Sequence, residues 1–154
     1  MNADSQAITL EITSKIAHLA VLVRAEFPSA GVDLQPWLTD AHTQGQLDPH
    51  SIDLSFFFPA HNLGLECRCL LMQVRFSEGL TSPTCQMLSV EASGFDSGRT
   101  QRWQFSTVDW QFTGDTPPNS HYQERFKYLT RHILRLFKCP IHVDFGHADF
   151  GFEG

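Results

Sequence analysis

The sequence predicts an α+β fold, in which a four-stranded antiparallel meander is flanked by an N-terminal and a C-terminal helix. Two observations predict it. Apolar residues recur every three or four positions in residues 5–27 and 119–138, but every second position through much of residues 51–112. Strands bracketed by helices are typical of α+β domains with both helices on one face of the sheet. The chain has 154 residues, so we expect one domain over residues 1–154.

Residues 5–27 are predicted to form the first helix. Asp4 or Ser5 is expected to cap its start, because a short side-chain oxygen accepts a hydrogen bond from the first-turn amides. Pro28 is expected to end it. The predicted apolar face consists of Ile8, Ile12, Ile16, Leu19 and Val23.

Residues 28–50 are rich in proline and glycine and are predicted to be a loop. A loop of this length without any local structure is uncommon inside a compact domain. We therefore expect a short helical turn around Gln35–Asp40, with Trp37 and Leu38 packed inward.

The first three strands are predicted from alternation. The first begins at Ser51, places every second residue up to Phe58 on one face and ends at Pro59. The second covers residues 65–76 and the third covers residues 85–94, and a hairpin turn around Gly98 follows. Short connections between consecutive strands favour antiparallel pairing.

The fourth strand contains a break in its alternation. Trp103 and Phe105 stand at odd positions, whereas Val108, Trp110 and Phe112 stand at even ones. A slip of one residue turns every later side chain to the other face. We expect a bulge near Ser106–Thr107 that restores the face, or alternatively two shorter strands.

Residues 119–138 are predicted to form the second helix. Ser120 and Gln123 have the spacing of a capping box. The apolar stripe consists of Tyr122, Phe126, Leu129, Ile133 and Leu136. Residues 139–154 form a tail rich in Phe, His, Asp and Gly.

Composition limits the function classes. The net charge of −6 argues against a protein that binds nucleic acid with its whole surface. The longest nearly apolar run, Ile16–Val23, is far below the roughly 20 residues that cross a bilayer, so we expect no membrane span and a cytoplasmic location. The four cysteines are expected to be reduced, and those at 67, 69 and 85 to be buried as small apolar residues rather than to form a sulfur site.

The sequence contains no common motif for phosphate binding, dinucleotide binding, zinc proteolysis, redox dithiols or calcium binding. We therefore expect a non-catalytic protein without a cofactor.

Two surfaces are candidates for partner binding. Leu10, Ala17 and Val21 form a second apolar strip on the first helix, which contacts a partner unless another part of the chain covers it. The second helix carries a basic stripe. Residues 119–138 have a net charge of +4, whereas the rest of the chain has a net charge of −10. Such a stripe either attracts an acidic surface or is a solvated outer face. Its members are Lys127, Arg131, Arg135 and Lys138.

The tail offers a possible metal site. It contains two pairs of histidine and aspartate, and Gly146 between them could turn the chain so that the pairs face each other. Such ligands suit a divalent ion such as zinc, iron or manganese. The alternative is a tail whose Phe residues dock on the domain. The candidate ligands are His142, Asp144, His147 and Asp149.

We therefore expect a cytosolic protein-binding or assembly factor that acts through its sheet face and helices. The arrangement is similar to small secretion-chaperone-like folds, an analogy of fold alone. The expected partner is an acidic protein or a second copy of the chain, rather than nucleic acid. The alternatives are a metal-binding protein or metal-dependent enzyme that uses the tail, and a small-ligand carrier with a Phe-lined pocket between sheet and helices.

Overall fold

The computed structural model describes residues 1–37 and 47–138. It confirms an α+β fold with an antiparallel sheet and helices at both ends, but the sheet has six strands, not four. The elements are α1 (Ala3–Gln6), α2 (Leu10–Glu26), β1 (Gly31–Asp33), β2 (Ser51–Asn62), β3 (Cys67–Phe76), β4 (Met87–Phe95), β5 (Gln101–Ser106), β6 (Gln111–Thr113) and α4 (Ser120–Lys138).

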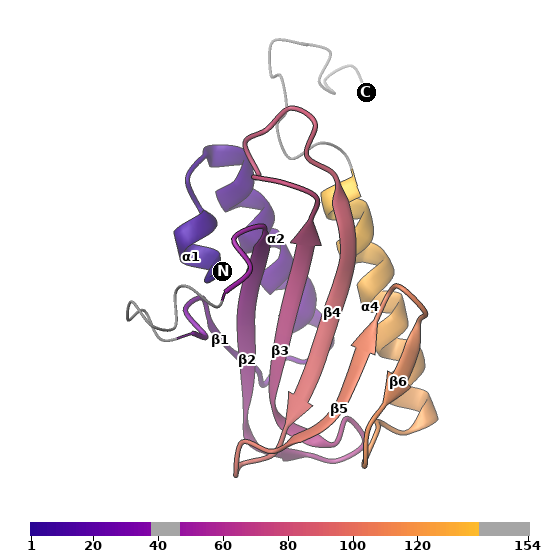
Figure 1. The fold of residues 1–154 in the computed structure, drawn as a ribbon. Coiled ribbons are helices and arrows are strands. Elements are labelled where there is room, and N and C mark those ends of the chain that lie inside the picture. The colour runs from indigo at the N-terminus through magenta and orange to yellow at the C-terminus, as the bar shows by residue number, and fades with distance from the viewer. Residues whose placement is uncertain (38–46, 139–154) are drawn as a thin grey trace, which may run out of the picture.

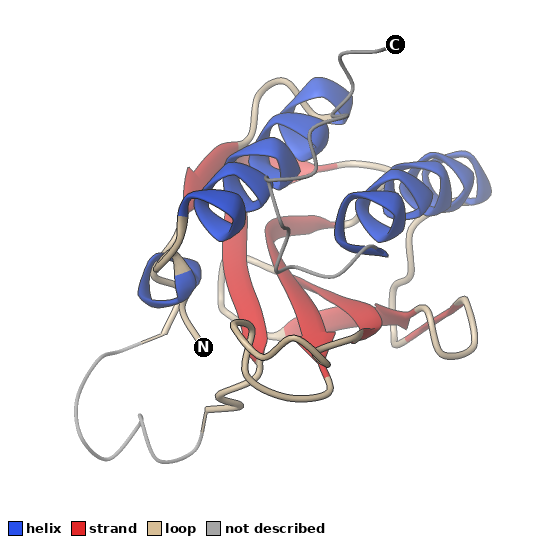
Figure 2. Ribbon diagram, turned by 90° about the horizontal axis from the view of Figure 1, so that it is seen from above, coloured by secondary structure: helices blue, strands red, loops and turns tan. Residues whose placement is uncertain are grey.

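The sheet is a meander in which every strand pairs antiparallel with its neighbour in sequence, in the order β1 to β6. Helices α2 and α4 lie side by side on the same face of the sheet (Figures 1 and 2). This confirms the two-layer arrangement that the sequence predicts. No helix in the described part of the chain is long and apolar enough to cross a membrane.

The hydrophobic core fills the space between sheet and helices. Alternate residues of β2 and β3 point into it, and so do Trp103 and Phe105 of β5. Both helices contribute one apolar stripe, but in α4 the last buried residue is Phe137 rather than the predicted Leu136, which is only partly buried. The helix residues that are buried there include Ile12, Ile16, Leu19, Val23, Phe126, Leu129, Ile133 and Phe137.

Helices α2 and α4 run antiparallel and are joined at both ends. Lys15 Nζ donates to the Leu136 carbonyl at 2.7 Å. At the other end, Arg125 Nε lies 2.7 Å from Glu26 Oε1. These contacts fix the pair of helices as one layer.

The first helix of the sequence prediction is divided. Residues 5–27 were expected to be continuous, but α1 and α2 are separate, and Ile8 between them is 64% exposed rather than part of the apolar face. The cap of α2 is not Asp4 or Ser5 but Thr9, whose hydroxyl accepts from the Ile12 amide at 3.2 Å. The break lets α1 pack beside β2, where Gln6 Nε2 donates to the Ser51 carbonyl at 2.9 Å.

Two short strands enlarge the predicted sheet. β1 forms inside the predicted 28–50 loop and pairs with β2. β6 arises because a turn through Thr107–Trp110, in which Trp110 has φ 58°, divides the predicted fourth strand. The bulge near Ser106–Thr107 is therefore wrong, and the alternative of two shorter strands holds. Phe105 of β5 and Phe112 of β6 still lie on the same face of the sheet, because they are directly opposite each other.

Two boundaries also differ from the prediction. β2 does not end at Pro59 but continues to Asn62. The pairing with β3 is irregular after Phe57, so the strand tolerates a proline, which has no backbone N–H to donate. α4 is capped by Asn119 rather than by Ser120, since Asn119 Oδ1 accepts from the Tyr122 amide at 2.9 Å.

Gly94 allows the sheet to pack against its largest buried side chain. Trp103 is fully buried, and its indole Nε1 donates to the Leu65 carbonyl at 2.8 Å. A Cβ on Gly94 would lie 2.4 Å from the Trp103 ring. Gly94 and Trp103 are direct partners across β4 and β5.

We expect Gly94→Ala to lower the free energy of unfolding by about 2 kcal/mol, because overpacking forces the buried indole to shift. Urea denaturation monitored by circular dichroism measures the loss. Gly79→Ala is the matched control, because a Cβ there meets nothing within 4 Å. Equal loss in the two variants would contradict the packing role of Gly94.

Candidate functional site

The sheet has one covered face and one open face, and the open face is the side that neither α2 nor α4 covers (Figure 2). Because side chains alternate along a strand, the partners of the core residues point there. Register places Ser55 of β2 beside Leu71 of β3, and Leu71 beside Ser93 of β4. Leu71 is only 9% exposed although it lies on this face.

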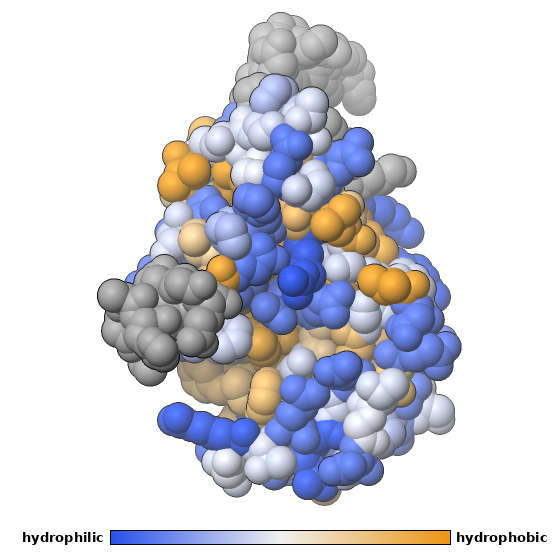
Figure 3. Space-filling view, viewed as in Figure 1, coloured by the Kyte–Doolittle hydropathy of each residue, from blue (hydrophilic) through white to orange (hydrophobic). Residues whose placement is uncertain are grey.

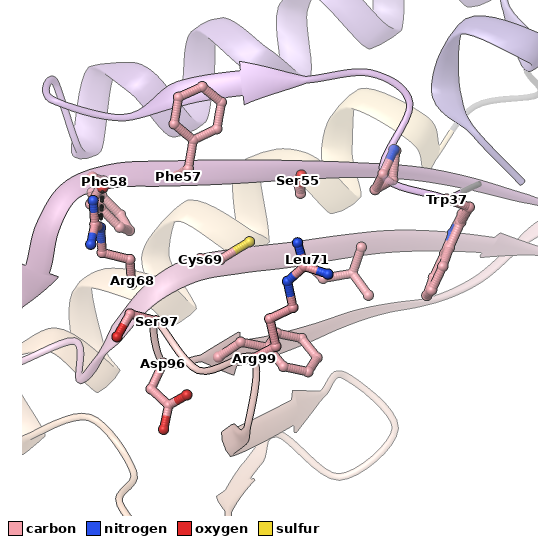
Figure 4. Close-up of a pocket in the computed structure, with 12 residues that line it drawn as sticks. Trp37, Ser55, Phe57, Phe58, Arg68, Cys69, Leu71, Asp96, Ser97 and Arg99 are labelled. Carbon is pink, nitrogen blue, oxygen red and sulfur yellow. Dashed lines mark hydrogen bonds between the residues drawn. The ribbon is translucent and has the colours of Figure 1, made fainter.

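Leu71 lines a hollow of about 690 Å³ on this face. Figure 3 shows the open face, with apolar side chains recessed among hydrophilic ones. The hollow lies on the side of the sheet away from the helices, so it is a different site from the Phe-lined pocket expected between sheet and helices, which stays a prediction. Its volume is within the range of small-molecule sites. Its lining residues are Pro36, Trp37, Ser55, Phe57, Phe58, Arg68, Cys69, Leu71, Phe95, Asp96, Ser97 and Arg99 (Figure 4).

Trp37 forms one wall of the hollow and is held at three points. Asn2 Oδ1 accepts from the Trp37 amide at 2.9 Å, and Asn2 Nδ2 donates to the Trp37 carbonyl at 3.1 Å. The indole Nε1 donates to Asp53 Oδ2 at 2.6 Å. Backbone and ring are both fixed, so this wall is preformed.

The Asp53 carboxylate joins three segments of the chain. It is 1% exposed and lies on β2. Besides the Trp37 indole, it accepts from the Ser51 hydroxyl at 2.7 Å and pairs with the Met1 ammonium at 2.8 Å. A buried carboxylate requires such partners, because its charge is otherwise costly to remove from water.

Phe57 forms a second apolar part of the hollow. Its side chain is 51% exposed, and its ring lies over Gly31 of β1, where a Cβ would come within 2.4 Å of the ring. Gly31 is the direct cross-strand partner of Phe57. A glycine at this position therefore lets the ring lie flat on the sheet edge.

The β4–β5 turn forms the opposite wall. The Asp96 amide donates to the Thr100 carbonyl at 2.9 Å, and Asp96 Oδ1 accepts from the Thr100 amide at 2.9 Å. Arg99 in this turn has φ 65°, a left-handed conformation. This confirms the hairpin turn that the sequence predicts around Gly98.

The three cysteines in the described part of the chain show no sign of activation. Burial raises the pKa of the Cys67 thiol to about 12. Burial also raises the pKa of Cys69, which lines the hollow, and the Asp33 carboxylate adds to the rise. Burial raises the pKa of Cys85 as well. The thiolate is the nucleophile and the metal ligand, so a raised pKa disfavours both roles. Cys67 and Cys85 are buried as predicted, whereas Cys69 is only half-buried.

The predicted apolar strip on α2 faces away from the core. Leu10 is 76% exposed, Val21 is 63% exposed, and Ala17 is also exposed. None of them lines the hollow. The predicted apolar strip is therefore separate from the candidate site.

The predicted basic stripe on α4 is only partly free. Lys127 Nζ lies 3.7 Å from Glu124 Oε2. The Arg131 guanidinium lies 5.6 Å from the centre of the Trp110 ring, a cation–π contact. Arg135 is exposed, and its one hydrogen bond within the described residues is to His132 at 3.4 Å.

The candidate metal ligands His142, Asp144, His147 and Asp149 lie outside the described residues, as does the side chain of Lys138. Within residues 1–37 and 47–138, no group of three or more His, Cys, Asp or Glu side chains is placed to hold a metal ion.

Sequence reasoning did not identify the hollow, although one signal for it was present. Phe57, Leu71 and Phe95 are apolar residues at strand positions that face away from the core. The sequence contains no signal for the hydrogen bonds of Asn2 and Asp53 to Trp37, because Asn2 is 35 positions and Asp53 is 16 positions from Trp37.

We expect Asp53→Asn to lower the free energy of unfolding by about 3 kcal/mol, because it removes a buried charge from its partners. It should also release the Trp37 wall, which the fluorescence and indole proton resonance of Trp37 report. Asp115→Asn is the control, since Asp115 is exposed and makes no hydrogen bond or ion pair to other described residues. An unchanged Trp37 resonance in Asp53→Asn would contradict this account of the wall.

No curated protein and no solved structure matches the chain. A family match covers residues 4–139, which include almost all of the described fold and every residue that lines the hollow. The chain belongs to this family, which is described as a domain of unknown function.

Proposed function

We propose that this protein is a non-catalytic, cytoplasmic binding protein whose binding surface is the open face of the sheet, centred on the hollow. One observation carries the proposal. A cavity of about 690 Å³ has an apolar floor on the solvent-facing side of a sheet, and its Trp37 wall is held by Asn2 and Asp53. Preformed apolar cavities with a few polar groups at their edge are typical of binding sites.

The polar groups around the hollow support binding rather than chemistry. Cys69 has a raised pKa. Ser55 lies on the floor, and no Ser, Thr or Cys side chain in the described part of the chain is hydrogen-bonded to a histidine. A nucleophile paired with a base is the usual signature of covalent catalysis.

An uncharged fluorescent probe, N-phenyl-1-naphthylamine, tests this proposal. We expect saturable binding to the folded protein, and we expect Phe57→Asp to weaken it about tenfold, because a charge replaces half-exposed apolar surface in the hollow. Leu88→Asp is the matched control, since Leu88 is 63% exposed and does not line the hollow. Equal affinity in the Phe57 and Leu88 variants would contradict the proposed surface.

The outer surface of the helices is a second candidate, for an acidic protein or for a second copy of the chain. The exposed Leu10, Ala17 and Val21 support it. Three side chains are nevertheless a small area beside the roughly 800 Å² per partner that a stable interface buries.

Light scattering tests the helical surface as a dimer interface. If the chain self-associates there, Leu10→Glu together with Val21→Glu should convert a dimer to a monomer, and Arg131→Glu with Arg135→Glu should shift the same equilibrium. A wild-type protein that is monomeric at high micromolar concentration would contradict self-association.

A further inference from the structure

Two guanidinium groups flank the apolar floor of the hollow. Arg68 lies on β3, and its Nε donates to the Phe58 carbonyl at 2.8 Å, which leaves its terminal nitrogens unbonded among the described residues. Arg99 extends from the β4–β5 turn toward Leu71 (Figure 4). Its guanidinium makes no hydrogen bond or ion pair with any described residue.

The nearby carboxylates already interact with groups other than these two arginines. Asp96 Oδ1 accepts from the Thr100 amide at 2.9 Å, and its Oδ2 lies 3.9 Å from Arg102. Asp33 is on the open face at the β1 edge, and its Oδ1 accepts from the Gln35 amide at 2.8 Å. Neither carboxylate forms an ion pair with Arg68 or Arg99 within the described residues.

Apolar side chains line the hollow beside the two guanidiniums. Leu71 lies on the floor, Phe57 and Trp37 stand at its sides, and Phe95 is at the end of β4. A ligand that covered Leu71 would contact aromatic side chains while one end reached a guanidinium. Guanidinium groups bind oxyanions through two parallel N–H···O hydrogen bonds, and such charge-assisted bonds are stronger than neutral ones.

We propose that the hollow binds an organic anion, in which an oxyanion group such as a carboxylate or phosphate is joined to an apolar body. The oxyanion pairs with Arg99, and the apolar body lies on Leu71 between Phe57 and Trp37. This inference rests on the proposed function of the open face. Because the chain as a whole carries −6, the positive charge at this position is local.

Two fluorescent probes separate the anionic group from the apolar body. 8-Anilinonaphthalene-1-sulfonate carries a sulfonate, whereas N-phenyl-1-naphthylamine has the same aromatic body without charge. We expect the wild-type protein to bind the sulfonate about tenfold more tightly than the uncharged probe, in line with hydrogen bonds to a charged group. Added salt should reduce this preference.

Arg99→Met should remove the preference by weakening sulfonate binding about tenfold and leaving the uncharged probe unaffected, because methionine keeps an unbranched apolar side chain. Arg99→Lys should retain part of the preference, since it keeps the charge without the guanidinium geometry. Arg135→Met is the matched control, because it removes an exposed guanidinium from α4 on the other face. Circular dichroism and unfolding curves establish that each variant is folded.

Displacement of the bound sulfonate then identifies the oxyanion. Decanoate and decyl phosphate carry alkyl chains of similar length on different oxyanions. Displacement by either compound supports the proposal and shows which head group is preferred. Displacement by neither, at concentrations below their micelle formation, would overturn it.

The remaining outcomes distinguish this inference from the proposed function. If both probes bind with equal affinity, Phe57→Asp weakens both and Arg99→Met changes neither, the anion preference is wrong and the hollow remains a binding site. If neither probe binds the folded protein, both ideas are wrong. If Arg135→Met weakens the sulfonate as much as Arg99→Met does, the probe binds elsewhere and the inference is overturned.

Discussion

The alternation of side chains along the strands places every second residue of β2, β3 and β4 on a side of the sheet that α2 and α4 do not cover. Two helices are enough to bury Ile52, Leu54 and Phe56, but they leave the intervening positions to other parts of the chain. Whether these positions are buried depends on the segments of the chain that lie over the open face. A sheet covered on one side is stable only if its other side is polar or is covered in some other way.

Part of this cover comes from the beginning of the described chain. Asp53 stands on the open face and is nevertheless buried, because Trp37 and the Met1 ammonium lie over it. Asn2 fixes the Trp37 backbone through both its side-chain atoms. The same contacts that bury a charged strand residue therefore also raise an aromatic wall beside Leu71. The β4–β5 turn supplies the facing wall and Arg99, so the hollow results from two loops that lie over one sheet.

The sequence predicted the core side of this fold well and the open side poorly. Periodicity was sufficient for α2, α4 and the long strands, because their apolar faces pack against one large neighbour. It did not predict β1 and β6, which are three residues each and depend on pairing with β2 and β5. The break before Thr9 was also missed, since the apolar spacing of Ile8 and Ile12 continues across it. The bulge and the two-strand alternative for residues 103–112 could be separated only by the Phe105–Phe112 pairing.

At the candidate site, too, local patterns were predicted well and long-range contacts were not. Leu10, Ala17 and Val21 were predicted as a surface strip from helical spacing, and they are exposed. The hollow needed the outward positions of Phe57 and Leu71 to be considered together with Trp37. These three residues are brought together by long-range contacts that local patterns do not contain. The sequence predicts a turn around Gly98 that includes Arg99, but no local pattern predicts that the Arg99 side chain extends toward Leu71.

The central claim is that an anionic group on an apolar body occupies the hollow beside Arg99. The most direct measurement is a two-dimensional ¹H–¹⁵N NMR titration of the labelled protein with 8-anilinonaphthalene-1-sulfonate. The account predicts saturable shifts of the Trp37 indole and the Arg99 side-chain Nε–H resonance with one shared dissociation constant, while the buried Trp103 indole and the Arg135 side chain stay unchanged. Shifts confined to α2 and α4, with Trp37 and Arg99 unmoved at saturation, would contradict it.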